Sequence, residues 1–537
     1  MARTTKYTLK EWDTLHNNGP FKLKTLYKTK LEGSGIMPSK LARYNDATQE
    51  IRHLIGEAQG SNEGFRAYGS AWSMSSIAHQ GDRMHFNAHM NLRSHFSGQE
   101  MHESSPYEAE NVFLVQCGNT IKEISAYLEE HGKSLKTTGA SNGQTIAGCI
   151  STGVHGSALG VGSVQDYIIG INLIIGPNEE DVVYLERHSK PVLTDMFIQK
   201  INARIIRNDG LFNAALVGLG SFGFIHGVVI EAEDLFLLKR YVRKIDNKTA
   251  LELAESLDFE NSTFKIEEET NDQGKGITPY HYKVFINQYS KEDDKYVVEC
   301  IYKKPYRHSY PDPFPIIKQS IYGDLIHLII SISRKFPKSI PAFVKSLEKT
   351  ILPAVDEITI GTLSETFWDA PYQGPAFACS FGVDHKDSPK ALKILTDLTK
   401  TAGPIPGIFA MRFVKQSDAI LSFAKFPVTC MIEIDGVLWK KSRKLISLEE
   451  FSRRMIMALM DHDIPFTIHW GKNADWVFPN LVGHMYGENV KTWKAYRKAF
   501  LAKDMQKLFS NDFLKTAGLF SDEDNDDDIP DDLIVSL

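Results

Sequence analysis

The run KTTGASNGQTIAGCISTGVHGSALGVGSVQD, residues 136–166, contains seven glycines. Glycine has no Cβ and tolerates positive φ, so this density lets backbone amides approach an anionic group closely. The run lacks the GxxxxGK[ST] pattern of a P-loop, and it carries no GxGxxG on a first strand-to-helix turn. Composition alone leaves two interpretations open, a glycine-rich turn of structural use and a cradle for a cofactor that carries a pyrophosphate.

Two other segments accompany this run in a fixed order. RAYGSAWS, residues 66–73, precedes it, and GLGSFGFIHGVVIEAE begins at Gly218. In order and spacing the three segments resemble the FAD domain of the vanillyl-alcohol oxidase family, whose fold is called PCMH-type. MPSKLARYNDATQEIRHLIGEA upstream is similar to the opening segment of that domain. The resemblance covers residues 30–237 and implies a two-subdomain FAD-binding domain.

The other end of the chain narrows the resemblance. IHWGK, residues 468–472, followed by WKAYRKAFLAKDMQKLFSNDFL, looks like the C-terminus of the aldonolactone and alditol oxidase branch. In that branch HWGK lies by the flavin, and the next segment packs back on the FAD domain. The resemblance implies an α+β fold with four parts: an FAD-binding domain at 30–237, an α+β cap domain with an antiparallel sheet at 238–466, a returning segment at 467–520 and an acidic tail at 521–537.

Hydrophobic periodicity predicts individual elements along the chain. Helices are expected at 47–58, 119–132, 389–400 and 448–463, the second ending at Gly132. Strands are expected at 64–69, 112–118, 263–268, 281–289 and 295–302. The segment 321–336 is amphipathic, and the pattern favours a packed cap helix over contact with a membrane surface.

Composition limits the partners and the compartment. The 537 residues carry a net charge of −6 and 42% hydrophobic residues, which is typical of a soluble globular protein and argues against nucleic acid as a partner. The cysteines form no CxxC pair and no metal-ligand cluster with histidine, so we expect no metal and a reducing compartment. The N-terminal residues lack the apolar core of a signal peptide, and a cytoplasmic location is expected.

The first loop departs from the family pattern at one residue. Many relatives have GSGHS here, and that histidine bonds covalently to the flavin 8-methyl group. This chain has GSAWS, with Trp72 in place of the histidine. An indole cannot form that bond, so FAD is expected to bind noncovalently, with Trp72 packed against the dimethylbenzene edge.

The resemblance also implies a set of cofactor contacts. His155 is assigned to cofactor contact without a covalent bond, and Cys149 is interpreted as a small buried residue rather than a nucleophile. The expected cofactor-binding residues are Tyr68, Gly69, Ser70, Ala71, Trp72, Ser73, Thr138, Gly139, Ala140, Ser141, Gln144, Thr145, Gly148, Cys149, Ser151, Thr152, His155, Gly156 and Ile225.

By resemblance, a hydride passes from a carbinol carbon to flavin N5 while a base takes the hydroxyl proton. A fixed cation near the ring would stabilise the negative charge that the ring gains. Lys472 is the first candidate and Arg412 the second, and His469 could hydrogen-bond the substrate hydroxyl or the ring. For each residue the alternative is a structural or surface role.

Two family glutamates are missing. The Glu-x-Arg pair of the branch reads Ala410-x-Arg412 here, and a second glutamate position corresponds to Ser380. Either Glu433 or Asp418 replaces the lost carboxylates, or the substrate is not a sugar. We expect an FAD-dependent oxidoreductase for a sugar lactone, polyol or related alcohol. The alternatives are an oxidase of a bulky apolar alcohol such as a sterol, as in type II cholesterol oxidases with the same FAD fold, and a flavin-binding protein without turnover.

One position bears on the electron acceptor. In related plant dehydrogenases an alanine before the glutamine-glycine turn screens the flavin from oxygen. The matching residue here is Gly139, or Ala140 if the alignment slips by one. A glycine leaves room for a diatomic gas, so O₂ is the expected acceptor and H₂O₂ the product. The alternative is that Gly139 serves only the turn.

Overall fold

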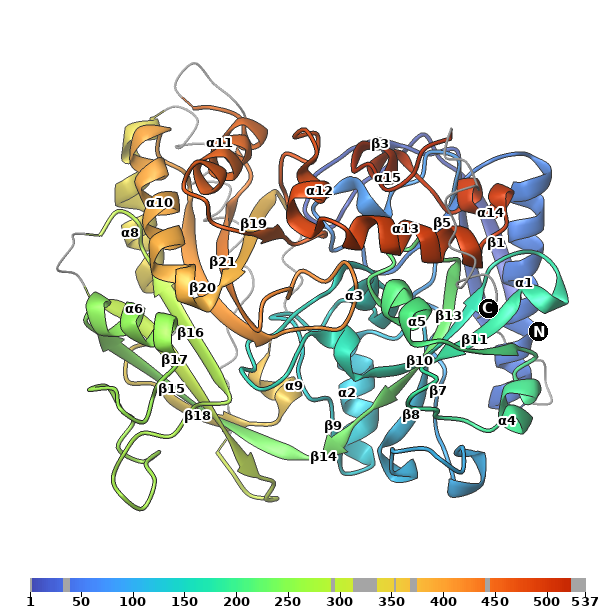
Figure 1. Ribbon diagram of the computed structural model, residues 1–537, viewed down its shortest axis with the longest axis horizontal. Coiled ribbons are helices and arrows are strands. Elements are labelled where there is room, and N and C mark those ends of the chain that lie inside the picture. Colours follow the sequence, from blue (N-terminus) through green and yellow to red (C-terminus); the bar gives the residue numbers. More distant parts are fainter. Residues whose placement is uncertain are drawn as a thin grey trace.

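The computed structural model describes residues 2–31, 39–290, 295–311, 336–351, 354–367, 374–439 and 445–522. Figure 1 shows two units side by side, with the N-terminal half of the chain on the right and the larger sheet on the left. The expected α+β class is confirmed by two mixed sheets in the first unit and one antiparallel sheet in the second.

The first unit contains the two smaller sheets. The four-stranded sheet has the order β1 (Ala2–Thr8), β4 (Thr25–Leu31), β6 (Arg83–Phe86), β5 (Phe65–Tyr68). The six-stranded sheet has the order β12 (Arg204–Arg207), β11 (Val182–Glu186), β10 (Ile168–Ile174), β13 (Phe224–Glu231), β8 (Val112–Gln116), β7 (Arg93–His95). Short ribbons join β2 (Glu11–Trp12) to β3 (Phe21–Lys22) and β9 (Lys133–Ser134) to β14 (Glu233–Asp234). Its helices are α1 (Lys40–Gly60), α2 (Ile121–Glu130), α3 (Ile146–Thr152), α4 (Asp195–Lys200) and α5 (Asp209–Leu216).

Two helices show how the local sequence sets the bounds. Helix α1 begins at Lys40, earlier than the predicted 47–58, because the Ser39 side chain caps it by accepting a hydrogen bond from the Ala42 amide. Helix α2 begins with a capping box between Thr120 and Glu123, and the chain turns away at Gly132, where φ is 69°. The predicted end of this helix is therefore confirmed.

The second unit is built on one eight-stranded sheet in which all the pairs are antiparallel. Its order is β18 (Ile358–Gly361), β15 (Phe236–Ile245), β17 (Tyr296–Pro305), β16 (His281–Ile286), β20 (Gly407–Lys415), β21 (Val428–Val437), β19 (Ala376–Asp384), β22 (Thr467–Ile468). The described helices of this unit are α6 (Asn247–Ser256), α8 (Ile340–Ile351), α9 (Leu363–Thr366), α10 (Ser388–Thr401) and α11 (Leu448–Asp461). Helices α6 and α10 lie on the outer side of the sheet in Figure 1, away from the first unit.

One predicted strand is wrong. Residues 263–268 form no strand, and β15 pairs with β17 instead. The segment ends in a turn because Glu269 is buried there, where its carboxylate accepts hydrogen bonds from Tyr241 Oη at 2.9 Å and Lys304 Nζ at 2.5 Å. A buried carboxylate needs such partners, and the turn brings Glu269 to them. The segment TFKIEE therefore forms no strand, although its apolar and polar residues alternate.

The last helices return to the first unit. They are α12 (Leu481–Tyr486), α13 (Asn489–Phe500), α14 (Lys503–Leu508) and α15 (Asp512–Thr516), and Figure 1 shows α13 to α15 lying over that unit. The Trp493 indole donates to Ala214 O at 3.1 Å, and Gln59 donates to Asp504 at 2.6 Å. The segment 468–472 therefore lies where the large sheet meets the first unit.

Some predictions fall outside the described residues. The predicted amphipathic helix at 321–336 is one, apart from Phe336, and the acidic tail beyond residue 522 is another. Among the residues that are described, none of the helices has the length and hydropathy needed to cross a membrane, and no cluster of metal-ligating side chains occurs.

Buried histidines make the fold sensitive to acid. Burial lowers the pKa of His85, His226 and His281 from 6.5 to about 3. The unfolded chain takes up protons on these residues below pH 6.5, whereas the folded chain does so only near pH 3. The free energy of unfolding therefore falls as the pH drops through this window, by up to about 1.4 kcal/mol per pH unit for each histidine.

We expect the melting temperature to fall steadily from pH 6.5 to about pH 5 and to fall less steeply in His226→Gln. His95→Gln, at an exposed position, is the matched control and should keep the wild-type slope. A melting temperature that stays constant over this range would show that these histidines do not control acid stability.

Candidate functional site

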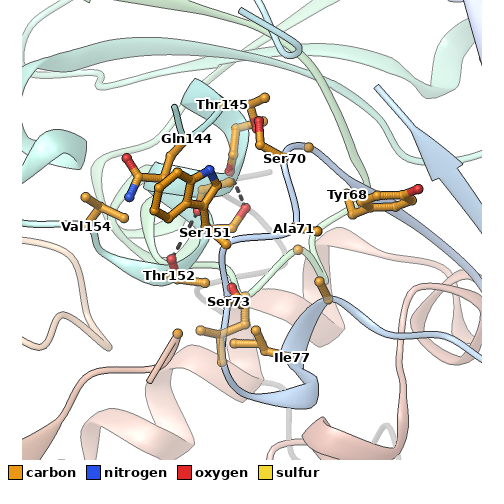
Figure 2. Close-up of a pocket in the computed structure, with 18 of the residues that line it drawn as sticks. Tyr68, Ser70, Ala71, Ser73, Ile77, Gln144, Thr145, Ser151, Thr152 and Val154 are labelled. Carbon is orange, nitrogen blue, oxygen red and sulfur yellow. Dashed lines mark hydrogen bonds between the residues drawn. The ribbon is translucent and has the colours of Figure 1, made fainter. Parts of the chain in front are cut away.

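A cavity of about 270 Å³ lies at the junction of the two units. Its walls are formed by the loop after β5, by α3 and the chain before it, by the start of β13, and by residues around 469–472. Figure 2 shows Tyr68, Ser70, Ala71 and Ser73 on one segment beside Gln144, Thr145 and Ser151 of another. The two glycine-bearing motifs of the sequence therefore face a common space.

The loop after β5 is held in an uncommon conformation. Ala71 has a φ of 55°, which few residues other than glycine adopt. A Cβ at Gly69 would lie 1.8 Å from Thr145 Oγ1, so only glycine allows the loop to approach α3 this closely. The Leu15 amide donates to Ala71 O at 2.8 Å, and the Met74 amide donates to Gly471 O at 2.8 Å. Segments from both ends of the chain thus fix the loop.

Polar atoms without partners line this part of the cavity. Among the described residues, Gln144 Oε1 and Thr145 Oγ1 are buried and make no hydrogen bond. Buried polar atoms are nearly always satisfied in folded proteins. The two oxygens are therefore candidates for hydrogen bonds to a polar ligand in the cavity.

The structure brings most of the expected cofactor-binding residues to this cavity. All nineteen line it except Thr138, Cys149 and Gly156. Gly156 packs behind the wall, where a Cβ would lie 2.7 Å from Thr138 O. Cys149 is fully buried and belongs to the hydrophobic core on the inner face of α3. These three residues do not line the cavity, because the turn and the short helix direct them into the protein, and their contact with the cofactor stays a prediction.

Trp72 lines the cavity and packs against other residues of its wall. A Cβ at Gly143 would lie 2.9 Å from the indole Cζ2, and the His16 ring lies edge-on to the indole with centroids 5.4 Å apart. His16 also lines the cavity, and burial, followed by the charge of Lys472, lowers its pKa to about 4. No local pattern in the sequence points to His16, because a contact between residues 16 and 72 depends on the tertiary fold.

A charged pair lies on the face of the large sheet that meets the cavity. Arg412 Nε donates to Glu433 Oε2 at 2.7 Å, and Arg412 Nη2 donates to Glu433 Oε1. The two side chains are only 8% and 3% exposed. In the sheet register Glu433 lies opposite Ala410 on one side and opposite Ser380 on the other. The Glu433 carboxylate therefore lies between Ala410 and Ser380, the two positions at which the family resemblance implies a glutamate that this chain lacks.

The pair is held in its charged form. Burial alone would raise the pKa of the Glu433 carboxyl, but Arg412, His155 and Lys472 together lower it well below its ordinary value. Asp418, the other predicted replacement, is exposed beyond the end of β20, where its charge acts on Asp166. Of the two candidates, only Glu433 accompanies Arg412.

Two neutral histidines lie beside the charged pair, with their rings 5.5 Å apart. Burial and then Arg412 lower the pKa of His155 to about 3, and burial and then His155 lower that of His469 well below its ordinary value. His155 Nδ1 lies 3.1 Å from Gly156 O and so carries the proton, which leaves Nε2 as an acceptor 3.8 Å from Glu433. His469 Nδ1 accepts from the Gly471 amide at 3.0 Å, so its Nε2 is a donor.

Lys472 completes the cluster. It lines the cavity and is half-buried, and among the described residues no carboxylate lies within 4 Å of its ammonium group. Its charge acts on His155, His469 and Glu433, lowering the pKa of each. The structure thus brings the predicted residues Lys472, His469, Arg412 and Glu433 to one end of the cavity.

One comparison with known proteins matches about a quarter of the chain, and this quarter contains the loop after β5 and α3. Residues 44–180 match a family model described as an FAD binding domain. D-arabinono-1,4-lactone oxidase of Candida glabrata is 29% identical over 143 residues, which are 27% of this chain and 23% of that protein. L-gulonolactone oxidase 3 of Arabidopsis thaliana is 31% identical over 121 residues, 22% of this chain and 18% of that protein. The matches thus span about a quarter or less of these relatives.

A solved structure is similar over almost the whole chain. Cholesterol oxidase from B. sterolicum superposes with a TM-score of 0.67 at 13% identity, covering 96% of this chain and 97% of that one. At this identity the likeness concerns the fold alone. It extends over both units, including the large antiparallel sheet.

Proposed function

We propose that the chain is a PCMH-type FAD-binding flavoprotein of the aldonolactone oxidase branch, an FAD-dependent oxidoreductase that acts on a CH–OH group of a small hydroxylated molecule. The proposed substrate class is a sugar lactone or polyol, and the proposed acceptor is O₂, which yields H₂O₂. The observation that carries this proposal is the Arg412–Glu433 pair beside two neutral histidines at the cavity wall.

The residues of the cavity fit FAD. Gly69 and the left-handed Ala71 leave the loop amides open to a phosphate, and Gln144 and Thr145 offer buried oxygens to hydroxyl groups of the ligand. When bound, FAD supplies the acceptor for a hydride. The chain itself must bind the substrate, hold its hydroxyl group and accept the proton.

The two histidines can handle that proton. The bonds of the two Nδ1 atoms leave His469 Nε2 able to donate a hydrogen bond and His155 Nε2 able to accept one, so a carbinol oxygen between them would be held by both. A proton that moves from the hydroxyl to His155 would make an imidazolium 3.8 Å from the Glu433 carboxylate, which stabilises it. Arg412 keeps that carboxylate charged.

Glu433 replaces the carboxylate that is missing at Ala410. Residues opposite each other on neighbouring antiparallel strands have Cβ atoms about 5 Å apart, and Ala410 and Glu433 are such a pair. A carboxylate from either position can reach Arg412. This relocation favours an active enzyme over a flavin-binding protein without turnover.

The face of the sheet around the pair favours a polar substrate over a sterol. Lys283 lies opposite Arg412 in the register and is half-buried, and Asp435 projects two residues beyond Glu433 and is exposed. Within the described part of the chain, neither has a partner of opposite charge within 4 Å. The large apolar side chains of this sheet lie in the core, as Phe381, Phe409, Ile432 and Ile434 do.

Turnover can be tested directly. The FAD-loaded protein should form H₂O₂ in air with an aldonolactone or a polyol, and a sterol should give none. Peroxide with the sterol alone would reverse the proposed substrate class.

We expect the FAD to be bound noncovalently, because Trp72 stands where relatives have the linking histidine. Among the described residues the cysteines are all buried, and none lines the cavity. Acid precipitation should release the yellow colour into the supernatant. Flavin that stays in the pellet and fluoresces on a denaturing gel would contradict this expectation.

Access of O₂ depends on the space beside Gly139. A Cβ there would lie 2.9 Å from Val154 Cγ1, so Val154 already occupies part of the room that the missing side chain leaves. We expect Gly139→Ala to slow the reoxidation of the reduced protein by O₂ by about tenfold or more, because the added methyl crowds this side of the cavity.

Stopped-flow mixing of the reduced protein with O₂ measures this rate. Val154→Ala, which widens the same space, should not slow reoxidation and serves as the matched control. The proposal would be wrong if the wild-type protein is reoxidised slowly and Gly139→Ala does not change that rate. This result would identify a dehydrogenase with another acceptor.

A further inference from the structure

Arg66, on β5 three residues before Gly69, is a buried cation in the cavity wall. It is 3% exposed and lines the cavity. Its guanidinium donates to Phe509 O at 3.1 Å and, through Nη2, to Leu219 O. Both acceptors are neutral carbonyls. Among the residues that the structure describes, no carboxylate lies within 4 Å of this guanidinium.

The turn after α5 adopts an uncommon backbone conformation where it contacts the Arg66 guanidinium. Leu219 has a φ of 52° and Gly220 a φ of 67°, so the turn after α5 adopts two left-handed residues in succession. For a leucine this conformation is strained. A Cβ at Gly220 would lie 2.9 Å from Arg66 Nη2, so glycine is needed for the close approach.

A buried cation of this kind needs a counter-ion. Desolvation of an unpaired charge is costly, and burial lowers the pKa of Arg66 to about 9. Arg412, another cation of the cavity wall, is already paired with Glu433, and Lys472 lies with His469. The negative charge of FAD at neutral pH resides on its two phosphates.

We propose that Arg66 binds the pyrophosphate of the FAD cofactor through charge-assisted hydrogen bonds from its free N–H groups. Two of its five donors hold Leu219 and Phe509, and these bonds orient the planar guanidinium toward the cavity. The proposal rests on FAD binding alone. It is independent of the substrate and of turnover.

The test compares ligands with and without the phosphates. Apoprotein is titrated with FAD and with riboflavin, which has the same ring and no phosphate, and flavin fluorescence gives the dissociation constants. Arg66→Met should weaken FAD binding by about 10- to 100-fold and change riboflavin binding by less than about twofold. Gly220→Ala, which displaces the guanidinium without removing it, should show the same selective loss.

Lys425→Met is the matched control, because Lys425 is also a half-buried cation that donates to a backbone carbonyl, that of Met485, but it does not line the cavity; it should leave both affinities unchanged. Equal weakening of FAD and riboflavin in Arg66→Met, or unaltered FAD binding, would overturn the proposal. If Arg66→Met does not fold, the test uses Gly220→Ala and Arg66→Lys instead. The proposal then requires that these variants lose affinity for FAD and keep their affinity for riboflavin. The titration contains no substrate, so its result is separate from the tests of the reaction.

Discussion

Replacing Lys472 with methionine is expected to slow the reduction of the flavin by substrate about 100-fold or more. The ammonium group is half-buried at the cavity wall, and no carboxylate of the described chain lies within 4 Å of it. A fixed donor that stabilises charge in such a site contributes roughly 3 kcal/mol to the transition state. Methionine has a similar length and no charge, so the change isolates the electrostatic contribution. Anaerobic stopped-flow measurement of flavin absorbance gives the rate.

Lys472→Arg is the matched control, because it keeps the positive charge and should retain much of the rate. The FAD content of each variant is measured alongside, so that cofactor loss is not mistaken for slow chemistry. An unchanged rate in Lys472→Met with FAD still bound would remove Lys472 from the mechanism. Arg412→Ala is measured in the same assay, and we expect a loss of at least similar size.

Removing Glu433 is expected to have two large effects. Glu433→Ala leaves Arg412 buried without its partner, which should lower the free energy of unfolding by about 3–5 kcal/mol. It also removes the carboxylate that stabilises a proton on His155, so flavin reduction should slow by about 100-fold or more. Chemical denaturation and anaerobic stopped flow measure the two effects.

The relocation of this carboxylate can be tested by moving it back. Adding Ala410→Glu to the Glu433→Ala variant places a carboxylate on the opposite residue of the neighbouring strand, from which it can reach Arg412. We expect this double variant to recover at least tenfold in reduction rate and part of the stability. Glu433→Gln keeps the shape without the charge and is the control. Wild-type rates in Glu433→Gln would show that the negative charge is not used.

The part of the candidate site that the two glycine-bearing segments form could be predicted because its requirements are local. The glycine-rich run and the loop at 69–73 need small residues and close backbone approach, as at Gly69 and Gly143, and these requirements can be recognised in consecutive residues. Helix α2 was predictable for the same reason, since its cap at Thr120 and its end at Gly132 are local signals. The bounds of α1 were less accurate because Ser39 starts the helix before the periodic region begins.

Features that depend on strand register could not be read in this way. Glu433 was only one of two candidates until the register placed it between Ala410 and Ser380. The role of Arg66 depends on carbonyls of Leu219 and Phe509, which are distant in the chain. The strand expected at 263–268 failed because the alternating pattern carries no information about a long-range ion pair such as that between Lys304 and Glu269.

The most direct test of the proposed reaction is anaerobic bleaching of the bound flavin. The FAD-loaded protein is mixed without oxygen with aldonolactones, polyols and a sterol, and the absorbance of the oxidised flavin is followed. We predict that a lactone or polyol abolishes this absorbance and that the sterol does not. Flavin that stays oxidised with every lactone and polyol, while dithionite still reduces it, would contradict the assignment of this site to CH–OH oxidation of a small hydroxylated molecule.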